Sequence, residues 1–238
     1  MNKKPRVLVI IPAYNEEKTI SEVIRGVQHH APSSNVLVIN DGSTDDTARV
    51  AKETGAKVIS HPFNLGYGAT LQTGYKYASH HSYDYVVQVD ADGQHEPRYI
   101  NDLLDVLKSN LADMVIGSRF LENHGYKPSW IRKVGMSILR IIIILVTKRS
   151  ITDCSSGFRA LTQQLVNFFA DIDYPSDYDD ADIILLTHLA GFRIKEVAVT
   201  MCESTTGKSM HRYNKLIYYG FKTLLSLMVT LLRKKPQR

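Results

Sequence analysis

The chain has 238 residues, of which 44% are apolar and 22% are charged. This composition is typical of a globular domain with a substantial core, and it excludes a disordered, collagenous or coiled-coil protein. The two cysteines exclude a disulfide framework and a cysteine-rich zinc module, and they favour a reducing compartment. The formal net charge of +5 favours phosphate-bearing or membrane-surface partners.

Short β-branched runs alternate with helical patterns along the first half of the chain. We expect strands at 7–11, 36–39, 58–59, 85–89 and 114–116, and helices at 20–27, from 43 or 44 to about 55, at 65–78 and at 100–107. This alternation predicts an α/β fold with a mainly parallel sheet covered by helices on both faces. Because ligands bind beyond the carboxyl ends of the strands in such sheets, the polar residues after each strand are the first candidates for a site.

No stretch reaches the roughly 18 uncharged apolar residues that a membrane-spanning helix needs. The apolar run at 7–11 is too short for a signal peptide. Two longer segments are strongly apolar, namely 134–147, which contains Arg140, and 216–232, which contains Lys222. We therefore expect neither a signal peptide nor a transmembrane helix.

Two carboxylates, Asp90 and Asp92, follow the apolar run at 85–89. In extended backbone, residues i and i+2 point to the same side, and two neighbouring carboxylates repel each other unless a cation lies between them. Their hard oxygen ligands suit Mg²⁺ or Mn²⁺. Gln94 and His95 follow closely enough to complete the coordination shell. The alternative is a solvated turn, but the polar ends of three other strands favour a metal site.

Three further strand ends carry candidate binding residues. Asp41 is placed to accept a hydrogen bond from a nucleobase, whereas Asp45 and Asp46 are interpreted as residues at a helix N-terminus. Glu16 either lies in the first turn of a helix or contacts a ribose. Arg119 is a candidate diphosphate clamp, with a surface salt bridge as the alternative.

Other familiar motifs are incomplete in this chain. The Gly-Tyr-Gly segment at 66–68 begins like a dinucleotide-binding fingerprint, but Leu71 stands where its third glycine is required. The Gly-Lys-Ser segment at 207–209 resembles the end of a P-loop, but Cys202 stands in the place of the first glycine. The nine histidines show no zinc-binding spacing.

Six segments together point to one family. They are IPAYNEE at 11–17, INDGSTD at 39–45, NLGYG at 64–68, VDADGQH at 89–95, GSRF at 117–120 and SGFRA at 156–160. In this order and spacing, over about residues 5–210, the chain resembles glycosyltransferase family 2. Within that family it is similar to dolichyl-phosphate mannose synthases and bacterial polyprenyl-phosphate glycosyltransferases.

The resemblance implies a Rossmann-like GT-A fold over residues 1–210 and a nucleotide-diphosphate sugar as donor. It implies metal-dependent transfer of the sugar, with inversion, to a polyprenyl or dolichyl phosphate. Asp90, Asp92 and Arg119 would be the catalytic residues. By matching position, the resemblance gives nucleoside contacts to Pro12, Ala13, Tyr14, Glu16, Ile39 and Asp41, diphosphate and metal contacts to Asp90, Ala91 and Asp92, a further metal ligand to Gln94 and a phosphate contact to Arg119.

Several basic positions agree only partly with the family pattern. Arg132 and Lys133 stand where related enzymes have basic residues for the acceptor phosphate, although they can also be charges at the start of an apolar helix. Ser204 and Met210 replace two basic residues of the family. We therefore expect Lys208 to supply the missing charge in the nucleotide-sugar site.

The acidic run at 177–182 suggests alternative functions. Family 2 enzymes that act on hydroxyl acceptors place a catalytic base in this region of the chain, so Asp179, Asp180 or Asp182 is a candidate base. An acidic cluster at a helix N-terminus is the simpler interpretation. The alternatives to lipid-phosphate transfer are transfer to a hydroxyl of a cell-surface glycan and a non-catalytic nucleotide-sugar-binding subunit.

The end of the chain, 211–238, is predicted to form a basic amphipathic helix. Four of its last six residues are Lys or Arg, and such a helix can lie among anionic headgroups. It can instead pack on the core of the enzyme or on a small membrane-protein partner. We expect a cytoplasmic protein bound peripherally at the cytoplasmic face of the membrane. We also expect the surplus of positive charge to bind lipid rather than nucleic acid.

Overall fold

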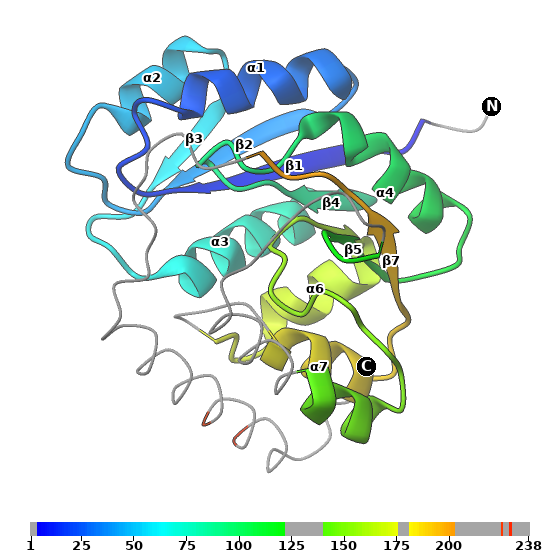
Figure 1. The fold of residues 1–238 in the computed structure, drawn as a ribbon. Helices are drawn as coiled ribbons and strands as arrows, with labels where there is room; N and C mark the ends of the chain where they lie inside the picture. The colour runs from blue at the N-terminus through cyan, green and yellow to red at the C-terminus, as the bar shows by residue number, and fades with distance from the viewer. Residues whose placement is uncertain (1–3, 122–139, 176–180, 203–224, 226–228, 230–238) are drawn as a thin grey trace.

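The computed structural model describes residues 4–121, 140–175, 181–202, 225 and 229. The strands of this described part are β1 (Val7–Ala13), β2 (Asn35–Asn40), β3 (Lys57–Ser60), β4 (Tyr85–Gln88), β5 (Met114–Ser118), β6 (Arg159–Thr162) and β7 (Ile194–Ala198). They form one seven-stranded sheet in the order β3-β2-β1-β4-β6-β5-β7 (Figure 1). Both pairs that involve β6 are antiparallel, and the other pairs are parallel.

Helices cover both faces of this sheet, as the sequence predicts. They are α1 (Ile20–His30), α2 (Thr47–Glu53), α3 (Tyr67–His80), α4 (Ile100–Lys108), α6 (Gln163–Asp171) and α7 (Ala181–Leu189), with the 3-10 turn η1 (Pro97–Tyr99) before α4. Residues 140–147 are also helical. Helices α1, α2 and α4 lie on one face, and α3 and α6 lie on the other (Figure 1). Within the described ranges, no helix is long and apolar enough to cross a membrane.

The alternation of side chains along β1 divides the core into two layers. Val7, Val9 and Ile11 pack in the layer that contains α1 and α4, whereas Leu8 and Ile10 pack with α3. A strand that is buried on both faces needs apolar residues at every position, which is why β1 is an uninterrupted apolar run.

The antiparallel strand β6 between the predicted strands β4 and β5 was not expected from the sequence. β6 begins inside the SGFRA segment and inserts between β4 and β5. Its register places Arg159 opposite Gln88, the last residue of β4. Because β6 runs in the opposite direction, the loop before it meets the carboxyl ends of its neighbours.

The edge of the sheet formed by these carboxyl ends contains a topological switch point. β1 pairs with β2 on one side and with β4 on the other. The connections after β1 and β4 therefore diverge, and a ligand crevice is expected between them. This edge carries the residues that follow β1, β2, β4 and β5, together with the loop 151–158.

Candidate functional site

The loops that follow β1 and β2 are bonded to each other. The backbone N–H of Asn15 donates to Ser43 Oγ at 3.0 Å, and the backbone N–H of Thr44 donates to Asn15 Oδ1 at 2.8 Å. The next backbone N–H, that of Glu16, donates to Thr47 Oγ1 at 2.8 Å. These bonds hold the segment 14–16 against the start of α2.

The residues expected to contact a nucleoside are brought to this one edge, but only some expose their side chains. Pro12 and Ala13 are buried at the end of β1. The side chain of Ile39 is fully buried in the core layer that contains α3. Tyr14 is exposed and Glu16 is partly exposed, so these two side chains are the ones accessible to a ligand.

Asp41 is buried, and its carboxylate already accepts hydrogen bonds from a neighbouring loop. His61 Nδ1 lies 2.7 Å from Asp41 Oδ1, the backbone N–H of Leu65 donates to the same oxygen at 2.9 Å, and the backbone N–H of Gly66 donates to Oδ2 at 3.0 Å. In this structure Asp41 therefore anchors the segment 61–66. Sequence reasoning missed His61, because no motif or spacing marks it.

Asp90 and Asp92 lie directly after β4, where the sequence places them. Asp90 Oδ1 accepts a hydrogen bond from the Tyr67 hydroxyl at 2.6 Å, and Asp92 Oδ1 accepts one from the backbone N–H of Gln94 at 3.0 Å. Burial, and after it the negative charge of Asp90, raises the pKa of Asp92 above its usual value. The two carboxylates are thus close enough to repel each other.

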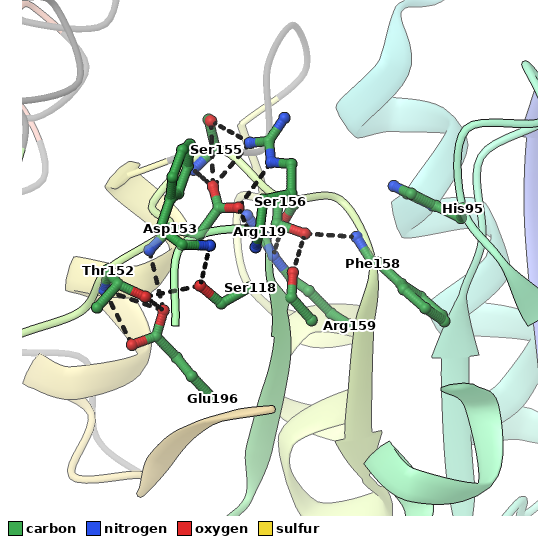
Figure 2. Close-up of polar contacts among 12 residues, drawn as sticks. His95, Ser118, Arg119, Thr152, Asp153, Ser155, Ser156, Phe158, Arg159 and Glu196 are labelled. Atoms are coloured by element: carbon green, nitrogen blue, oxygen red, sulfur yellow. Dashed lines mark hydrogen bonds and ion pairs between the residues drawn. The ribbon is translucent and has the colours of Figure 1, made fainter. Parts of the chain in front are cut away.

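His95 supports Asp90 from the protein interior. Its Nδ1 accepts the backbone N–H of Asp90 at 2.9 Å, so in the neutral ring the proton is on Nε2, which lies 3.5 Å from Asp90 Oδ2. The buried imidazole stacks on Phe158, with ring centroids 5.0 Å apart (Figure 2).

Arg119, the predicted diphosphate clamp, is paired with a buried carboxylate. Its Nε and Nη2 donate to the two oxygens of Asp153, each at 2.7 Å, and Nη2 also donates to Ser155 Oγ at 2.8 Å (Figure 2). On the other side, Glu196 of β7 accepts from the hydroxyl of Thr152 at 2.7 Å and from the backbone N–H of Asp153 at 2.9 Å. The salt bridge is thus built into the interior, because Asp153 is fully buried.

The loop 151–157 joins this ion pair to the aspartate pair. The Ser156 hydroxyl donates to the backbone carbonyl oxygen of Gly117, near the end of β5, at 2.6 Å. A Cβ at Gly157 would lie 2.9 Å from the Tyr67 hydroxyl and 3.0 Å from Asp90 Oδ2. Only glycine fits this close approach without movement, so one loop contacts both halves of the candidate site.

Only some of the remaining predicted residues are described. Ala91 is buried between the two aspartates, and Asp182 is buried in the first turn of α7. The backbone N–H of Cys202 donates to the carbonyl oxygen of Gln94 at 2.9 Å, which brings the chain beside the site. Arg132, Lys133, Asp179, Asp180, Ser204, Lys208 and Met210 lie outside the described residues.

A divalent cation fits the chemistry of the aspartate pair. Among the described residues, no group of three or more His, Cys, Asp or Glu side chains is arranged to hold a metal ion. Two carboxylates with substrate phosphates are, however, a common way for proteins to bind Mg²⁺. The repulsion that raises the pKa of Asp92 is relieved by such a cation.

Comparison with known proteins identifies the family. The model of glycosyl transferase family 2 matches residues 8–168. The chain belongs to glycosyltransferase family 2. This family 2 glycosyltransferase is 31% identical to the undecaprenyl-phosphate mannosyltransferase of Micrococcus luteus, over 86% of each protein. It is 29% identical to the UDP-N-acetylglucosamine–dolichyl-phosphate N-acetylglucosaminyltransferase of Methanococcus voltae, over 94% of this chain and 95% of that protein.

A solved structure supports the fold. The glucosyl-3-phosphoglycerate synthase of Mycobacterium tuberculosis, in complex with Mn²⁺, UDP and phosphoglyceric acid, superposes with a TM-score of 0.77. The match covers 97% of this chain and 80% of that one, at 20% identity. The predicted α/β architecture is therefore confirmed as GT-A-like. The two relatives differ in the sugar that they transfer, so donor and acceptor belong to the proposal below.

Proposed function

We propose that this family 2 glycosyltransferase moves a sugar, with inversion, from a nucleoside-diphosphate donor to a polyprenyl or dolichyl phosphate. The observation that carries the proposal is the aspartate pair Asp90 and Asp92 at the switch point of the sheet, beside a loop that also holds Arg119. The names of the relatives from Micrococcus luteus and Methanococcus voltae support a lipid phosphate as acceptor.

In this proposal the aspartate pair holds Mg²⁺ or Mn²⁺, with Gln94 as a further ligand. The ion, when bound, stabilises the negative charge of the departing nucleoside diphosphate. Arg119 contacts the diphosphate. The segment 12–16 and the end of β2, with Ile39 and Asp41, surround the nucleoside, and Lys208 contributes a positive charge to the donor site.

The acceptor needs little activation by the protein. A phosphate oxygen is already ionised at neutral pH, so no strong general base is required. Arg132 and Lys133 are proposed to hold this phosphate. Transfer to a sugar hydroxyl would instead need a base. Asp182, a candidate for that role, is buried on α7, so the described residues give the hydroxyl alternative no support.

A lipid acceptor requires contact with a bilayer, and we propose peripheral binding at the cytoplasmic face of the membrane. The predicted segment 211–238 would contribute a basic amphipathic helix that follows the catalytic domain at 1–210. The described helix 140–147 offers a second contact. Its side chains Ile141 and Leu145 are 56% and 72% exposed, and Arg140, Lys148 and Arg149 beside them are exposed too.

The direct test is a transfer assay with a panel of labelled UDP- and GDP-sugars, Mn²⁺ and polyprenyl phosphate. We expect one donor to give label that is extractable into organic solvent. A chelator and the Asp92→Ala variant should abolish this label. Asp105→Ala serves as the control, because Asp105 is exposed and pairs only with Lys108 among the contacts described. Label in no lipid product with any donor would contradict the proposal, and label in a glycan polymer would favour a hydroxyl acceptor.

A further inference from the structure

A fully buried glutamine, Gln88, interrupts the apolar core at the end of β4. Buried polar groups destabilise a fold unless they are hydrogen-bonded. Gln88 is bonded on both sides. Its Oε1 accepts from the Tyr75 hydroxyl at 3.1 Å, and its Nε2 donates to the Tyr67 hydroxyl oxygen at 2.8 Å. Tyr67 in turn donates to Asp90 Oδ1 at 2.6 Å.

The direction of each hydrogen bond in this series follows from the bond between Tyr67 and Asp90. Tyr67 gives its single hydroxyl proton to Asp90 Oδ1. The oxygen of Tyr67 must then accept from the amide NH₂ of Gln88, which turns the amide oxygen toward Tyr75. All three protons thus point toward Asp90, and successive bonds of this kind polarise one another.

Both oxygens of Asp90 are constrained in this arrangement. Oδ1 accepts the Tyr67 proton, and His95 Nε2 lies 3.5 Å from Oδ2. The backbone of Gly157 lies directly against the Tyr67–Asp90 bond, with no room for a Cβ. The carboxylate therefore has a defined orientation before any ligand arrives.

We propose that Tyr67, Gln88 and Tyr75 are positioning residues that fix the orientation of the Asp90 carboxylate for a divalent metal ion. This inference rests on the function proposed above, in which Asp90 is a metal ligand. Hydrogen-bonded partners of metal ligands typically contribute about 10- to 100-fold to metal affinity or activity. Tyr67 contacts the ligand directly, and Tyr75 acts through Gln88.

The test measures Mn²⁺ binding to the full chain from the loss of the free-Mn²⁺ electron paramagnetic resonance signal. We expect Tyr67→Phe to raise the Mn²⁺ dissociation constant about tenfold or more, and Tyr75→Phe to raise it less. Tyr83→Phe is the matched control and should leave it unchanged. The Tyr83 hydroxyl donates to Asn35 at 3.1 Å, at the opposite edge of the sheet.

Thermal unfolding of each variant establishes that it is folded. A folded Tyr67→Phe with wild-type Mn²⁺ affinity would overturn the inference, as would an equal loss in Tyr83→Phe. If the wild-type chain itself binds no Mn²⁺, the proposed metal-dependent function fails. A crystal structure of Tyr67→Phe then decides the positioning role separately: a reoriented Asp90 carboxylate supports it, and an unchanged orientation overturns it.

Discussion

Asp92 is placed where its negative charge is unfavourable in the metal-free protein. Burial is the larger cause of its raised pKa, and the charge of Asp90 is the next; the backbone N–H of Gln94 opposes them only in part. A carboxyl group whose pKa is raised on folding stabilises the fold below its unfolded pKa of about 4. This contribution is lost as the pH rises through the raised value, so at neutral pH the ionised Asp92 carboxylate lowers the free energy of unfolding.

We therefore predict that Asp92→Asn stabilises the metal-free protein at pH 7. The amide oxygen can still accept the Gln94 N–H, so the turn is kept. A gain of about 1 kcal/mol corresponds to a rise in Tm of about 2–4 °C for a chain of this size. The gain should shrink as the pH falls toward 4, and added Mn²⁺ should no longer raise Tm. Thermal unfolding in a chelator between pH 4 and 8 measures the first trend, and thermal unfolding with and without Mn²⁺ in a chelator-free buffer measures the second. A lower Tm for the variant at pH 7 would refute this account.

At the residue scale, the aspartate pair is predictable from sequence and its supports are not. Asp90 and Asp92 are marked by local features, namely a buried strand followed by two carboxylates two residues apart. Tyr67 and Asp153 act through partners 23 and 34 residues away. Such partners are decided by the register of the sheet and by the loop before β6. The sequence singles out Arg119 as a candidate phosphate contact, but it does not reveal the carboxylate that pairs with it.

The loop 151–157 connects distant elements through buried polar contacts. Arg119 at the end of β5 is bonded to Asp153, whose backbone is held by Glu196 on β7. Removing one partner of a buried ion pair typically destabilises a protein by about 3–5 kcal/mol, because the other charge is left without a partner. The loop is therefore expected to be a stabilising element as well as part of the site.

We predict that Asp153→Asn lowers the free energy of unfolding by about 3 kcal/mol. Asp46→Asn is the matched control. Asp46 also pairs with an arginine, Arg49 at 2.8 Å, but both side chains are more than half exposed, so its loss should change stability far less than the loss of Asp153. Urea denaturation of both variants gives the comparison. Equal effects would show that the burial of Asp153 contributes nothing.

At the element scale, the first half of the fold follows from the sequence and much of the second half does not. Strands β1 to β5 are apolar runs separated by amphipathic helices, and the periodic pattern finds them. β6 has four residues and begins with the buried Arg159, so only its pairing with β4 and β5 reveals it. α7 is buried on nearly every side, so no helical period marks it, and only the acidic cluster interpreted as a helix N-terminus indicates a helix there.

At the scale of the whole molecule, the described residues include an acidic edge of the sheet and, on the helix at 140–147, an apolar surface flanked by basic residues. The aspartates lie beyond the carboxyl ends of the central strands, where a cation and a diphosphate can meet. Ile141 and Leu145 lie four residues apart on one helix and are exposed, with Arg140 directly before them and Lys148 and Arg149 directly after the helix. Apolar side chains flanked by positive charges favour binding to anionic bilayers.

The final prediction tests this surface with the double variant Ile141→Ser, Leu145→Ser. If both side chains enter the bilayer, their loss should weaken binding to phosphatidylglycerol vesicles by at least about tenfold, since burial of each contributes roughly 1.5–3 kcal/mol. Leu111→Ser is the control, because Leu111 is about as exposed as Ile141, at 52%, but lies just after α4. Vesicle co-sedimentation at low and high salt measures the effect, and salt should weaken binding of the wild-type chain. Unchanged binding of the double variant would leave the segment 211–238 as the proposed membrane contact.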